Sequence, residues 1–306
     1  DRRRPGLNFP ASSRDESDLV EILSGTFEGK TTGTPISLII KNRDINSSDY
    51  DDLKNVFRPG HGDYSYYKKY GIRDHRGGGR ASARETAARV AAGAIAKLII
   101  GEIGIKVTAF TRELGGIRAE KFSLEDISRN MLSCPDLKAA EKMEKALNDA
   151  RNNGDSLGGI VEVLVRGCPP GLGDPVFDKI DADLAKALMG IGSVKGVEIG
   201  SGFKAARMTG FTNNDPVMPE GFLTNNAGGI LAGITNGDEI VIRVACKPIS
   251  SIERPQQTID IKGKPATVSI KGRHDVCAIP RIIPVCEAMA GIVLADHLLR
   301  QKALRC

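Results

Sequence analysis

The sequence predicts an α+β protein in which two related halves share one core. Short stretches of alternating aliphatic residues, typical of strands, are interspersed with longer stretches of helical periodicity and joined by glycine-rich connections. A sixteen-residue pattern recurs at a constant offset of 204 residues, with seven positions that agree in character. Glycine accounts for 35 of 306 residues and tryptophan is absent, so we expect an aliphatic core and many backbone positions that need glycine.

Each element is predicted from its residue pattern. Strands are expected where β-branched and aliphatic residues alternate or cluster, at 36–41, 105–111, 160–166, 239–246, 258–261 and 266–271. Helices are expected where apolar residues recur every three or four positions, at 82–100, 136–152, 175–190 and 284–304. No long linker interrupts this series, which favours one domain over residues 1–306.

The internal repeat joins residues 25–40 to residues 229–244. Each copy is a glycine-rich loop that leads into a strand, and each is later followed by a helix with an early glutamate, Glu85 or Glu287. The repeat predicts two pseudo-symmetric halves, roughly 1–155 and 156–306, related by a pseudo-two-fold axis. The alternative is that the same turn chemistry arose twice.

Composition excludes several classes of protein. No apolar run in the sequence reaches the roughly 18 to 20 residues of a membrane span. The six cysteines lack the paired spacing of a zinc or redox site, and the four histidines do not cluster, so we expect no metal. Few cysteines in a chain of this length favour a reducing compartment, and we expect a cytoplasmic protein.

The positive charge is concentrated in one segment. The net charge is only +5, but residues 54–90 carry nine lysines and arginines against three acidic residues. Such a concentration predicts an anionic partner: a nucleic acid, a phosphorylated small molecule or a phosphate-bearing cofactor.

Residues 74–86 have the features of a phosphate-binding loop. Three glycines precede a helix N-terminus, where backbone amides and the helix dipole attract anions, and Arg76, Arg80 and Arg84 add guanidinium donors. Ser82 and Glu85 have capping-box spacing. The alternative is a glycine-rich connection with surface arginines.

A tyrosine-rich stretch lies just upstream. Four of the five tyrosines fall within residues 64–70 and are interleaved with Lys68 and Lys69, a pattern that also suits a surface for single-stranded nucleic acid. A nucleic-acid-binding module built on residues 54–90 is therefore the alternative function. His61, between two glycines in this basic segment, is a candidate proton donor.

A second candidate loop follows the strand at 266–271. Arg273, His274 and Asp275 place a cation, a titratable group and a carboxylate in one turn, although an ordinary surface ion pair is the alternative. We expect His297 to be structural, and Cys277 and Cys286 to be small core residues.

Taken in order, the sequence motifs resemble those of the chorismate synthase family over essentially the whole chain. They occur at residues 1–6, 22–29, 32–34, 57–61, 75–86, 195–200, 226–229, 247–251 and 272–275. The resemblance implies a β-α-β sandwich, usually a homotetramer, that converts 5-enolpyruvylshikimate 3-phosphate to chorismate and phosphate. It implies an anti-1,4-elimination that needs reduced FMN, and it leaves open whether NADPH serves this chain as reductant. No nucleic acid and no membrane are expected as partners.

The resemblance also implies roles for individual residues. His61 matches the histidine proposed to protonate or hold the reduced flavin, Asp275 the carboxylate that helps flavin N5 remove the C6 proton, and Ser82 a serine of the same pocket. The cofactor-binding positions that match are Arg80, Ala81, Ser82, Gly192, Ser193, Ala232, Lys247, Pro248, Ile249, Ser250, Ser251 and Arg273. The substrate-binding arginines that match are Arg3, Arg58, Arg84 and Arg273.

Three departures from the family pattern are visible. The family's Gly-Glu-Ser-His-Gly motif, whose histidine is thought to protonate the leaving phosphate, has no counterpart in the sequence, and the resemblance makes activity depend on it. Phe9 stands where many members carry an arginine, and Val276 replaces a proline after Asp275.

Overall fold

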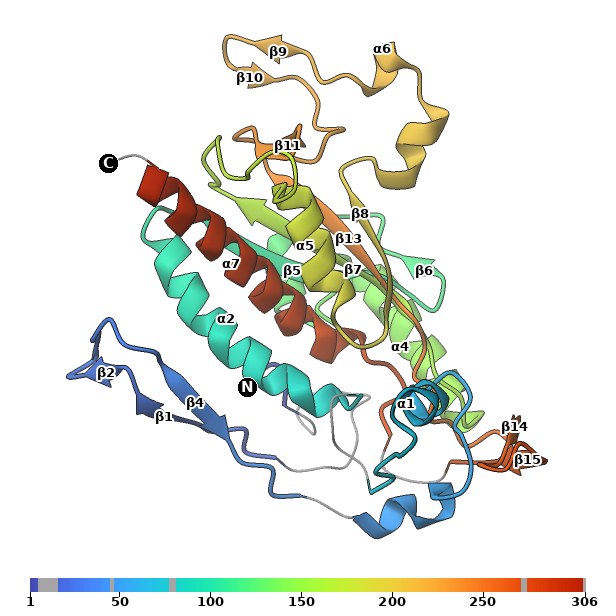
Figure 1. Cartoon of the computed structure of the whole chain (residues 1–306). Helices are drawn as coiled ribbons and strands as arrows, with labels where there is room; N and C mark the ends of the chain where they lie inside the picture. The colour runs from blue at the N-terminus through green and yellow to red at the C-terminus, as the bar shows by residue number, and fades with distance from the viewer. Residues whose placement is uncertain (5–15, 45–46, 77–80, 271–273, 305–306) are drawn as a thin grey trace.

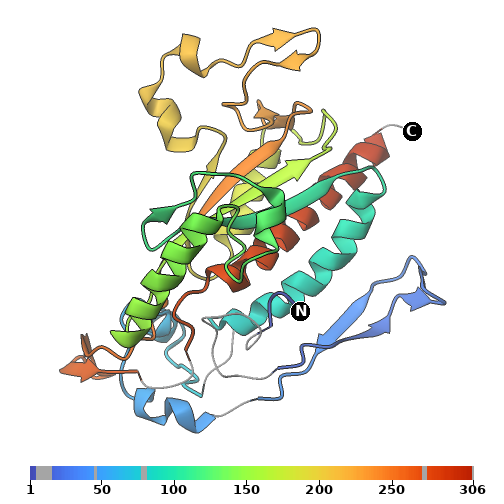
Figure 2. The same cartoon turned by 180° about the vertical axis from the view of Figure 1, so that it is seen from behind.

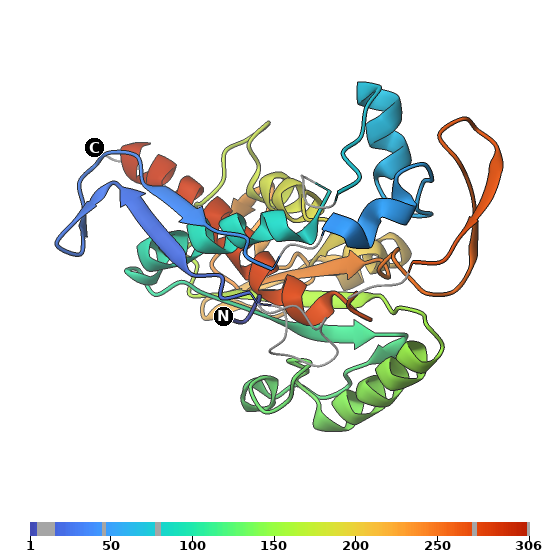
Figure 3. The same cartoon turned by 90° about the horizontal axis from the view of Figure 1, so that it is seen from below.

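A layer of helices lies between two antiparallel sheets in the computed structural model, which describes residues 1–4, 16–44, 47–76, 81–270 and 274–304 (Figures 1 and 3). The larger sheet has the order β6 (Ile117–Arg118), β5 (Lys106–Leu114), β7 (Gly159–Arg166), β13 (Ile240–Cys246) and β8 (Val194–Ile199). The smaller sheet pairs β1 (Val20–Ser24) with β4 (Ser37–Ile40). Between them lie α2 (Thr86–Gly101), α5 (Ile180–Met189) and α7 (Ile279–Leu304). The predicted α+β class and β-α-β sandwich are confirmed.

The core forms where α7 packs against β5 and β7 on one side and against α2 on the other. Ala109, Val163, Ile242, Ile283 and Leu294 are fully buried there. The two helices touch at Gly93, because a Cβ at that position would lie 2.3 Å from the Cβ of Ala288. On the opposite face of the large sheet lies α4 (Leu137–Asn152), which begins at the N-cap Asp136 as the sequence predicts (Figure 2).

Helix α7 is longer than predicted. It begins at Ile279 rather than at Pro284 and contains that proline in its interior. Pro284 lacks the N–H that would bond to residue 280, which is why the sequence marks it as a start rather than as a continuation. By length and composition α7 is the one described helix that could cross a membrane, but 72% of its most apolar window is buried inside the protein, as in a core helix.

The remaining elements are short. The predicted helix at 175–190 is shortened to α5, and β1, β8 and α1 (Asp63–Tyr70) were not predicted. The shorter strands are β2 (Thr26–Phe27), β3 (Lys30–Thr31), β9 (Val217–Met218), β10 (Gly221–Phe222), β11 (Ile230–Leu231), β12 (Ile234–Thr235), β14 (Gln256–Ile259) and β15 (Pro265–Val268). The short helices are η1 (Ser47–Leu53), η2 (Ala83–Glu85), α3 (Leu124–Ile127), η3 (Gly202–Arg207) and α6 (Gly210–Asn213).

The sequence repeat is also a structural repeat. The hairpins β2–β3 and β11–β12 have the same register, and each leads into a longer strand, β4 or β13. In each copy the N–H of the residue after the hairpin donates to the carbonyl of the glycine that precedes the hairpin. Thr32 donates to Gly25 and Asn236 donates to Gly229, each over 3.0 Å. Left-handed backbone occurs at matching positions: Gly25, Glu28, Gly29 and Gly33 in one copy, and Gly229, Ala232, Gly233 and Gly237 in the other. The division into halves at residue 155 stays a prediction.

Five of the six cysteines are free and buried, as expected for core residues. Burial raises the pKa of the Cys168 thiol to about 11 and those of Cys246 and Cys277 to about 12. Because the thiolate is the reactive form, we expect iodoacetamide at pH 8 to leave these five unmodified in the native protein and to alkylate them after denaturation, as counted by mass spectrometry. Rapid native labelling of Cys246 or Cys277 would contradict the packing.

Candidate active site

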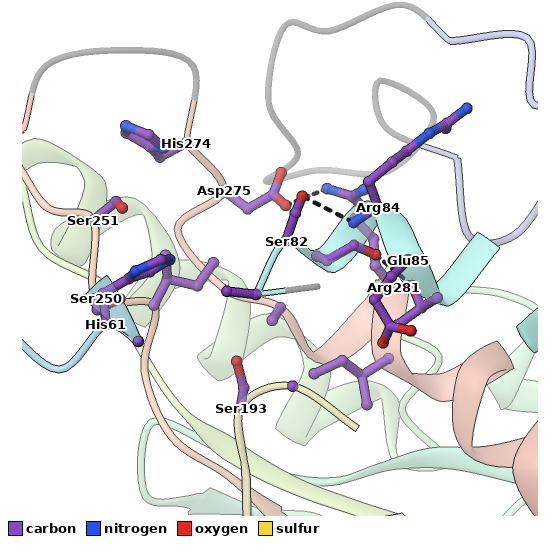
Figure 4. Close-up of a pocket in the computed structure, with 18 of the residues that line it drawn as sticks. His61, Ser82, Arg84, Glu85, Ser193, Ser250, Ser251, His274, Asp275 and Arg281 are labelled. Atoms are coloured by element: carbon purple, nitrogen blue, oxygen red, sulfur yellow. Dashed lines mark hydrogen bonds and ion pairs between the residues drawn. The ribbon is translucent and has the colours of Figure 1, made fainter. Parts of the chain in front are cut away.

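A cavity of about 390 Å³ lies where the first turns of α2 and α7 meet the loop that follows α5 and the loops at residues 58–62 and 247–251 (Figure 4). Its walls come from residues 58–62, 81–86, 191–193, 247–251 and 274–285. A more open groove of about 710 Å³ adjoins it and shares His61, Ser193 and Lys247 with it. A concave site of this volume, built from loops on a rigid core, is the usual setting for small-molecule chemistry.

Arginines dominate one wall of the cavity. Arg3 is 4% exposed and donates to Thr86 Oγ1 at 2.9 Å, and its Nη1 forms an ion pair with Asp18 Oδ2 at 2.9 Å. Arg84 pairs with the other oxygen of Asp18, and the Nε of Arg281 donates to the Arg3 carbonyl at 3.3 Å. Burial, together with the positive charges of Arg281 and Arg84, lowers the pKa of Arg3 to about 10 although Asp18 opposes the shift. The wall therefore attracts further anions.

Asp275 lies on the same side of the cavity as Ser82 and Arg84 (Figure 4). Its Oδ2 accepts a hydrogen bond from Arg281 Nη1, and its side chain is 11% exposed. Ser82 is the N-cap of η2, and its Oγ accepts the N–H of Arg84 at 3.2 Å. The predicted capping box is therefore wrong in both halves, because Ser82 accepts from the N2 amide rather than the N3 amide and Glu85 pairs with Arg89 at 3.0 Å.

His61 stands on a tight turn at the facing wall. The His61 N–H donates to the Arg58 carbonyl at 3.2 Å, and Gly60 has a φ of +67°, which is typical of a type II turn with proline and glycine at its centre. His61 Nδ1 lies 2.9 Å from Asp63 Oδ1, and Arg58 Nε donates to Asp63 Oδ2 at 2.7 Å. Two predicted site residues thus share one buried carboxylate.

The groove beside the cavity is bordered by lysines. Lys247 Nζ donates to the Gly60 carbonyl at 2.8 Å, and its backbone N–H donates to the Ser193 carbonyl at 2.9 Å. Burial and the charge of Lys195 lower the pKa of Lys247. Among the described residues neither lysine forms an ion pair, and Arg89 also borders the groove. Such a border suits a phosphate group.

The cavity brings together most of the predicted site residues. Those that line it are Arg3, Arg58, His61, Ala81, Ser82, Arg84, Gly192, Ser193, Lys247, Ile249, Ser250, Ser251 and Asp275. Pro248 does not line it, and Ala232 lies elsewhere, at the tip of the β11–β12 hairpin. Arg80 and Arg273 lie outside the described residues. The roles of all these residues stay predictions.

Sequence reasoning missed three charged residues of the site. Arg281 lines the cavity, and Asp18 and Asp63 neutralise its arginines and His61. No local motif marks Asp18 or Arg281, whereas Asp63 contacts its sequence neighbours Arg58 and His61. Asp18 lies 66 positions from Arg84, and Arg281 falls within an apolar stretch of α7, so only the folded chain shows what they contact.

The tyrosine-rich stretch is the helix α1, and part of it faces the protein rather than solvent. The rings of Tyr64 and Tyr67 pack against Phe57, with centroids 5.4 and 5.5 Å apart, and Tyr66 packs against Tyr70 at 5.8 Å. Tyr64, Tyr66 and Tyr70 are nevertheless 46%, 38% and 60% exposed, so these ring contacts alone do not exclude stacking on bases.

A lined cavity with converging guanidinium groups, a carboxylate and a histidine defines an enzyme that acts on anionic small molecules. The sequence model of chorismate synthase matches residues 1–299, and the chain belongs to the chorismate synthase family. It is 65% identical to the chorismate synthase of Syntrophus aciditrophicus over 99% of this chain and 87% of that protein. It is 56% identical to that of Methanosarcina mazei over 98% and 85%.

A solved structure gives the same result. The crystal structure of a chorismate synthase superimposes with a TM-score of 0.73 at 37% identity, over 92% of this chain and 78% of that one. The protein is thus a carbon–oxygen lyase of aromatic amino acid biosynthesis, with the chorismate synthase fold and function. The comparisons lend no support to the alternative of a nucleic-acid-binding module.

Proposed function

We propose that the cavity binds 5-enolpyruvylshikimate 3-phosphate and eliminates its phosphate to give chorismate. The observation that carries this assignment is the convergence of Arg3, Arg84 and Arg281 on one wall, with Asp275 among them and His61 facing them. The substrate has one phosphate and two carboxylates, which guanidinium groups bind with paired hydrogen bonds. Fixed positive charge also stabilises the phosphate as it leaves.

Reduced FMN is the proposed cofactor, and the residues present fit it. Lys195 and Lys247 lie close enough to repel each other, and no described carboxylate compensates either of them, as expected where a phosphate binds. Ser193, Ser250 and Ser251 add hydroxyl groups on the adjoining walls. When bound, the reduced flavin supplies an electron-rich ring that promotes elimination without net redox change. NADPH is proposed as a reductant for this flavin.

The residues of the chain divide the proton chemistry between two walls. Asp275, held by Arg281, is the base of the arginine wall, and we assign it the uptake of the proton that leaves C6 of the substrate. His61, held by Asp63, is the acid of the facing wall, and it keeps a proton directed at the flavin. Arg3 and Arg84 hold the anionic groups of the substrate while these protons move.

Assembly as a cytoplasmic homotetramer is also part of the proposal. Residues 202–223 extend away from the body of the protein and expose large apolar side chains, including Phe203 at 78% and Phe211 at 94% (Figure 1). Exposed aromatic side chains on a projecting segment favour an interface with another chain. Light scattering after size-exclusion chromatography tests the number of subunits.

The activity is tested by anaerobic assay of the chain joined to a family segment that carries the Gly-Glu-Ser-His-Gly motif, with photoreduced FMN and substrate, and chorismate is followed by its absorbance. We expect chorismate and phosphate in equal amounts, and no product with oxidised FMN. Absence of both flavin binding and product would refute the proposal. Tight RNA binding with a steep dependence on salt would instead support the alternative.

Phosphate and sulfate are expected to stabilise the protein. The pKa of Arg3 is lowered because its charge is buried beside Arg281, so an anion bound there relieves repulsion in the folded state alone. At about ten times its Kd such an anion adds about 1.4 kcal/mol to the free energy of unfolding, which differential scanning calorimetry detects. Chloride at matched ionic strength is the control, and an equal shift with chloride would rule out a specific site.

A further inference from the structure

The side chain of Asp63 is held by Arg58, His61 and Arg73, although it does not line the cavity. It is 5% exposed, in the first turn of α1. Its Oδ2 accepts from Arg58 Nε at 2.7 Å and from the Arg58 backbone N–H at 3.2 Å, and it lies 2.9 Å from Arg73 Nη1. Its Oδ1 accepts from Arg58 Nη2 at 2.9 Å and lies 2.9 Å from His61 Nδ1.

The ionisation of Asp63 determines which nitrogen of His61 carries the proton. Burial opposes ionisation, but the hydrogen bonds from Arg58 and His61 outweigh it and hold the pKa of Asp63 well below its usual range. A carboxylate can only accept, so Nδ1 must donate to it. Arg58 Nη2 also lies 3.1 Å from Nδ1, but this group already donates to Oδ1 over the shorter distance of 2.9 Å.

We propose that Asp63 is a positioning residue that holds His61 with its Nδ1–H directed at the Asp63 carboxylate, so that Nε2 is the nitrogen that exchanges a proton in the cavity. No described residue bonds to Nε2, and His61 lines both the cavity and the groove. This inference rests on the proposed role of His61 as an acid. The arrangement is chemically sound because a carboxylate on one imidazole nitrogen fixes the ring and stabilises its protonated form.

The same carboxylate fixes the surrounding wall. Arg73 pairs with Asp63, donates to the carbonyls of Leu53 and Lys54, and lies 5.7 Å from the ring centroid of Phe57. Leu53 lines the cavity. Asp63 therefore joins the His61 turn, the Arg58 guanidinium group and the end of η1. This predicts two separable effects of its loss, one on turnover through His61 and one on substrate binding through Arg58.

The charged groups around His61 set the expected pH dependence. Arg58 and Asp63 contact it directly, and Lys247 and Glu85 border the cavity and the groove beside it. Asp63→Asn removes the negative charge that contacts the imidazole among the described residues and leaves the positive charges of Arg58 and Lys247. The protonated ring then becomes less stable, so the alkaline limb of the turnover profile moves to lower pH.

The kinetic test compares Asp63→Asn with the wild type and with Asp52→Asn, which replaces an exposed aspartate of η1 as a matched control. We expect Asp63→Asn to lower kcat by about 10- to 100-fold, part of the ~10²–10⁴ that a positioned proton donor supplies. We also expect it to raise the KM for the substrate and to shift the alkaline limb downward. Asp52→Asn should match the wild type. A folded Asp63→Asn with wild-type kcat and pH profile would overturn the proposal.

A double variant separates action through His61 from a general structural effect. In a His61→Gln background, Asp63→Asn should leave kcat within about twofold of His61→Gln alone, because the group it positions is gone. The rise in KM through Arg58 should remain. If Asp63→Asn costs the same factor in kcat with and without His61, Asp63 acts structurally and the proposal is wrong.

A spectroscopic measurement tests the tautomer of His61 without depending on turnover. Long-range ¹H–¹⁵N correlation spectra of the wild type distinguish the two imidazole tautomers, and His61→Gln identifies the His61 signals. We expect the Nδ1–H tautomer at alkaline pH, and its loss or mixture with Nε2–H in Asp63→Asn. A pure Nε2–H tautomer in the wild type would overturn the proposal. If the tautomer is as expected but His61→Gln keeps wild-type turnover, the proposed acid role of His61 fails instead.

Discussion

Replacement of Asp275 by asparagine is expected to lower kcat by about 10²- to 10⁴-fold, the usual contribution of a positioned general base. The amide keeps the shape of the side chain, and its oxygen still accepts from Arg281, but it cannot take up a proton. Loss of a negative charge beside Arg281, Arg3 and Arg84 should at the same time strengthen binding of the anionic substrate, so we expect KM to stay level or fall. Steady-state kinetics with reduced FMN measure both.

An effect on KM rather than on kcat would assign Asp275 a different role. If the variant keeps its kcat and only its KM rises, Asp275 orients the substrate through Arg281 and is no base. Asp174→Asn is a suitable control because Asp174 is a partly exposed aspartate on a loop that does not line the cavity. Unchanged unfolding temperatures would show that neither substitution disturbs the fold.

The position of the site could be predicted from the sequence because its main parts are local motifs. The turn at His61, the cap at Ser82 and the loop at 247–251 each carry a glycine, capping or proline signal that short-range chemistry explains, and the fold brings them to one cavity. Asp18 and Arg281 could not be predicted, because Asp18 pairs with Arg3 and Arg84 across the fold and Arg281 reaches the Arg3 carbonyl as well as the nearby Asp275. Charge compensation between distant segments leaves no local pattern.

The secondary structure was likewise predictable only where the local sequence pattern is continuous. The strands β5, β7 and β13 have continuous aliphatic patterns and were predicted within a few residues. Strand β8 was missed because Lys195 and Gly196 interrupt its pattern, and it is stabilised by pairing with β13. Helix α1 was missed because its tyrosines have weak helix propensity, so its stability depends on packing of Tyr64 and Tyr67 against Phe57.

The structure also changes the meaning of the basic segment 54–90. Its arginines first suggested any polyanion, but several are engaged within the protein. Arg58 and Arg73 pair with Asp63, Arg84 with Asp18 and Arg89 with Glu85. The segment therefore offers ligands a set of fixed guanidinium groups, of which Arg58 and Arg84 line the cavity, beside the exposed side chains of Lys54, Lys68, Lys69 and Arg76. Fixed groups discriminate by geometry, which suits a small anionic substrate better than a nucleic acid backbone.

Replacement of His61 by alanine is the second large effect that we expect, a fall in kcat of about 10²- to 10⁴-fold with FMN still bound. Flavin binding should survive because the lysines and serines of the groove come from other segments, at Ser193, Lys195 and 247–251. His75→Gln is the matched control, since it alters a histidine of the same basic segment that does not line the cavity. Anaerobic turnover and a fluorescence titration of FMN measure the two quantities separately.

The size of the loss distinguishes two roles for His61. If the imidazole only fills space, a His61→Asn variant should recover most of the activity, because asparagine has a similar polarity and occupies part of the same volume. If it carries a proton, asparagine should be as inactive as alanine across the pH range, and the fall should be in kcat rather than in flavin affinity. Loss of FMN binding in His61→Ala with an unchanged kcat at saturating FMN would make His61 a cofactor contact instead of an acid.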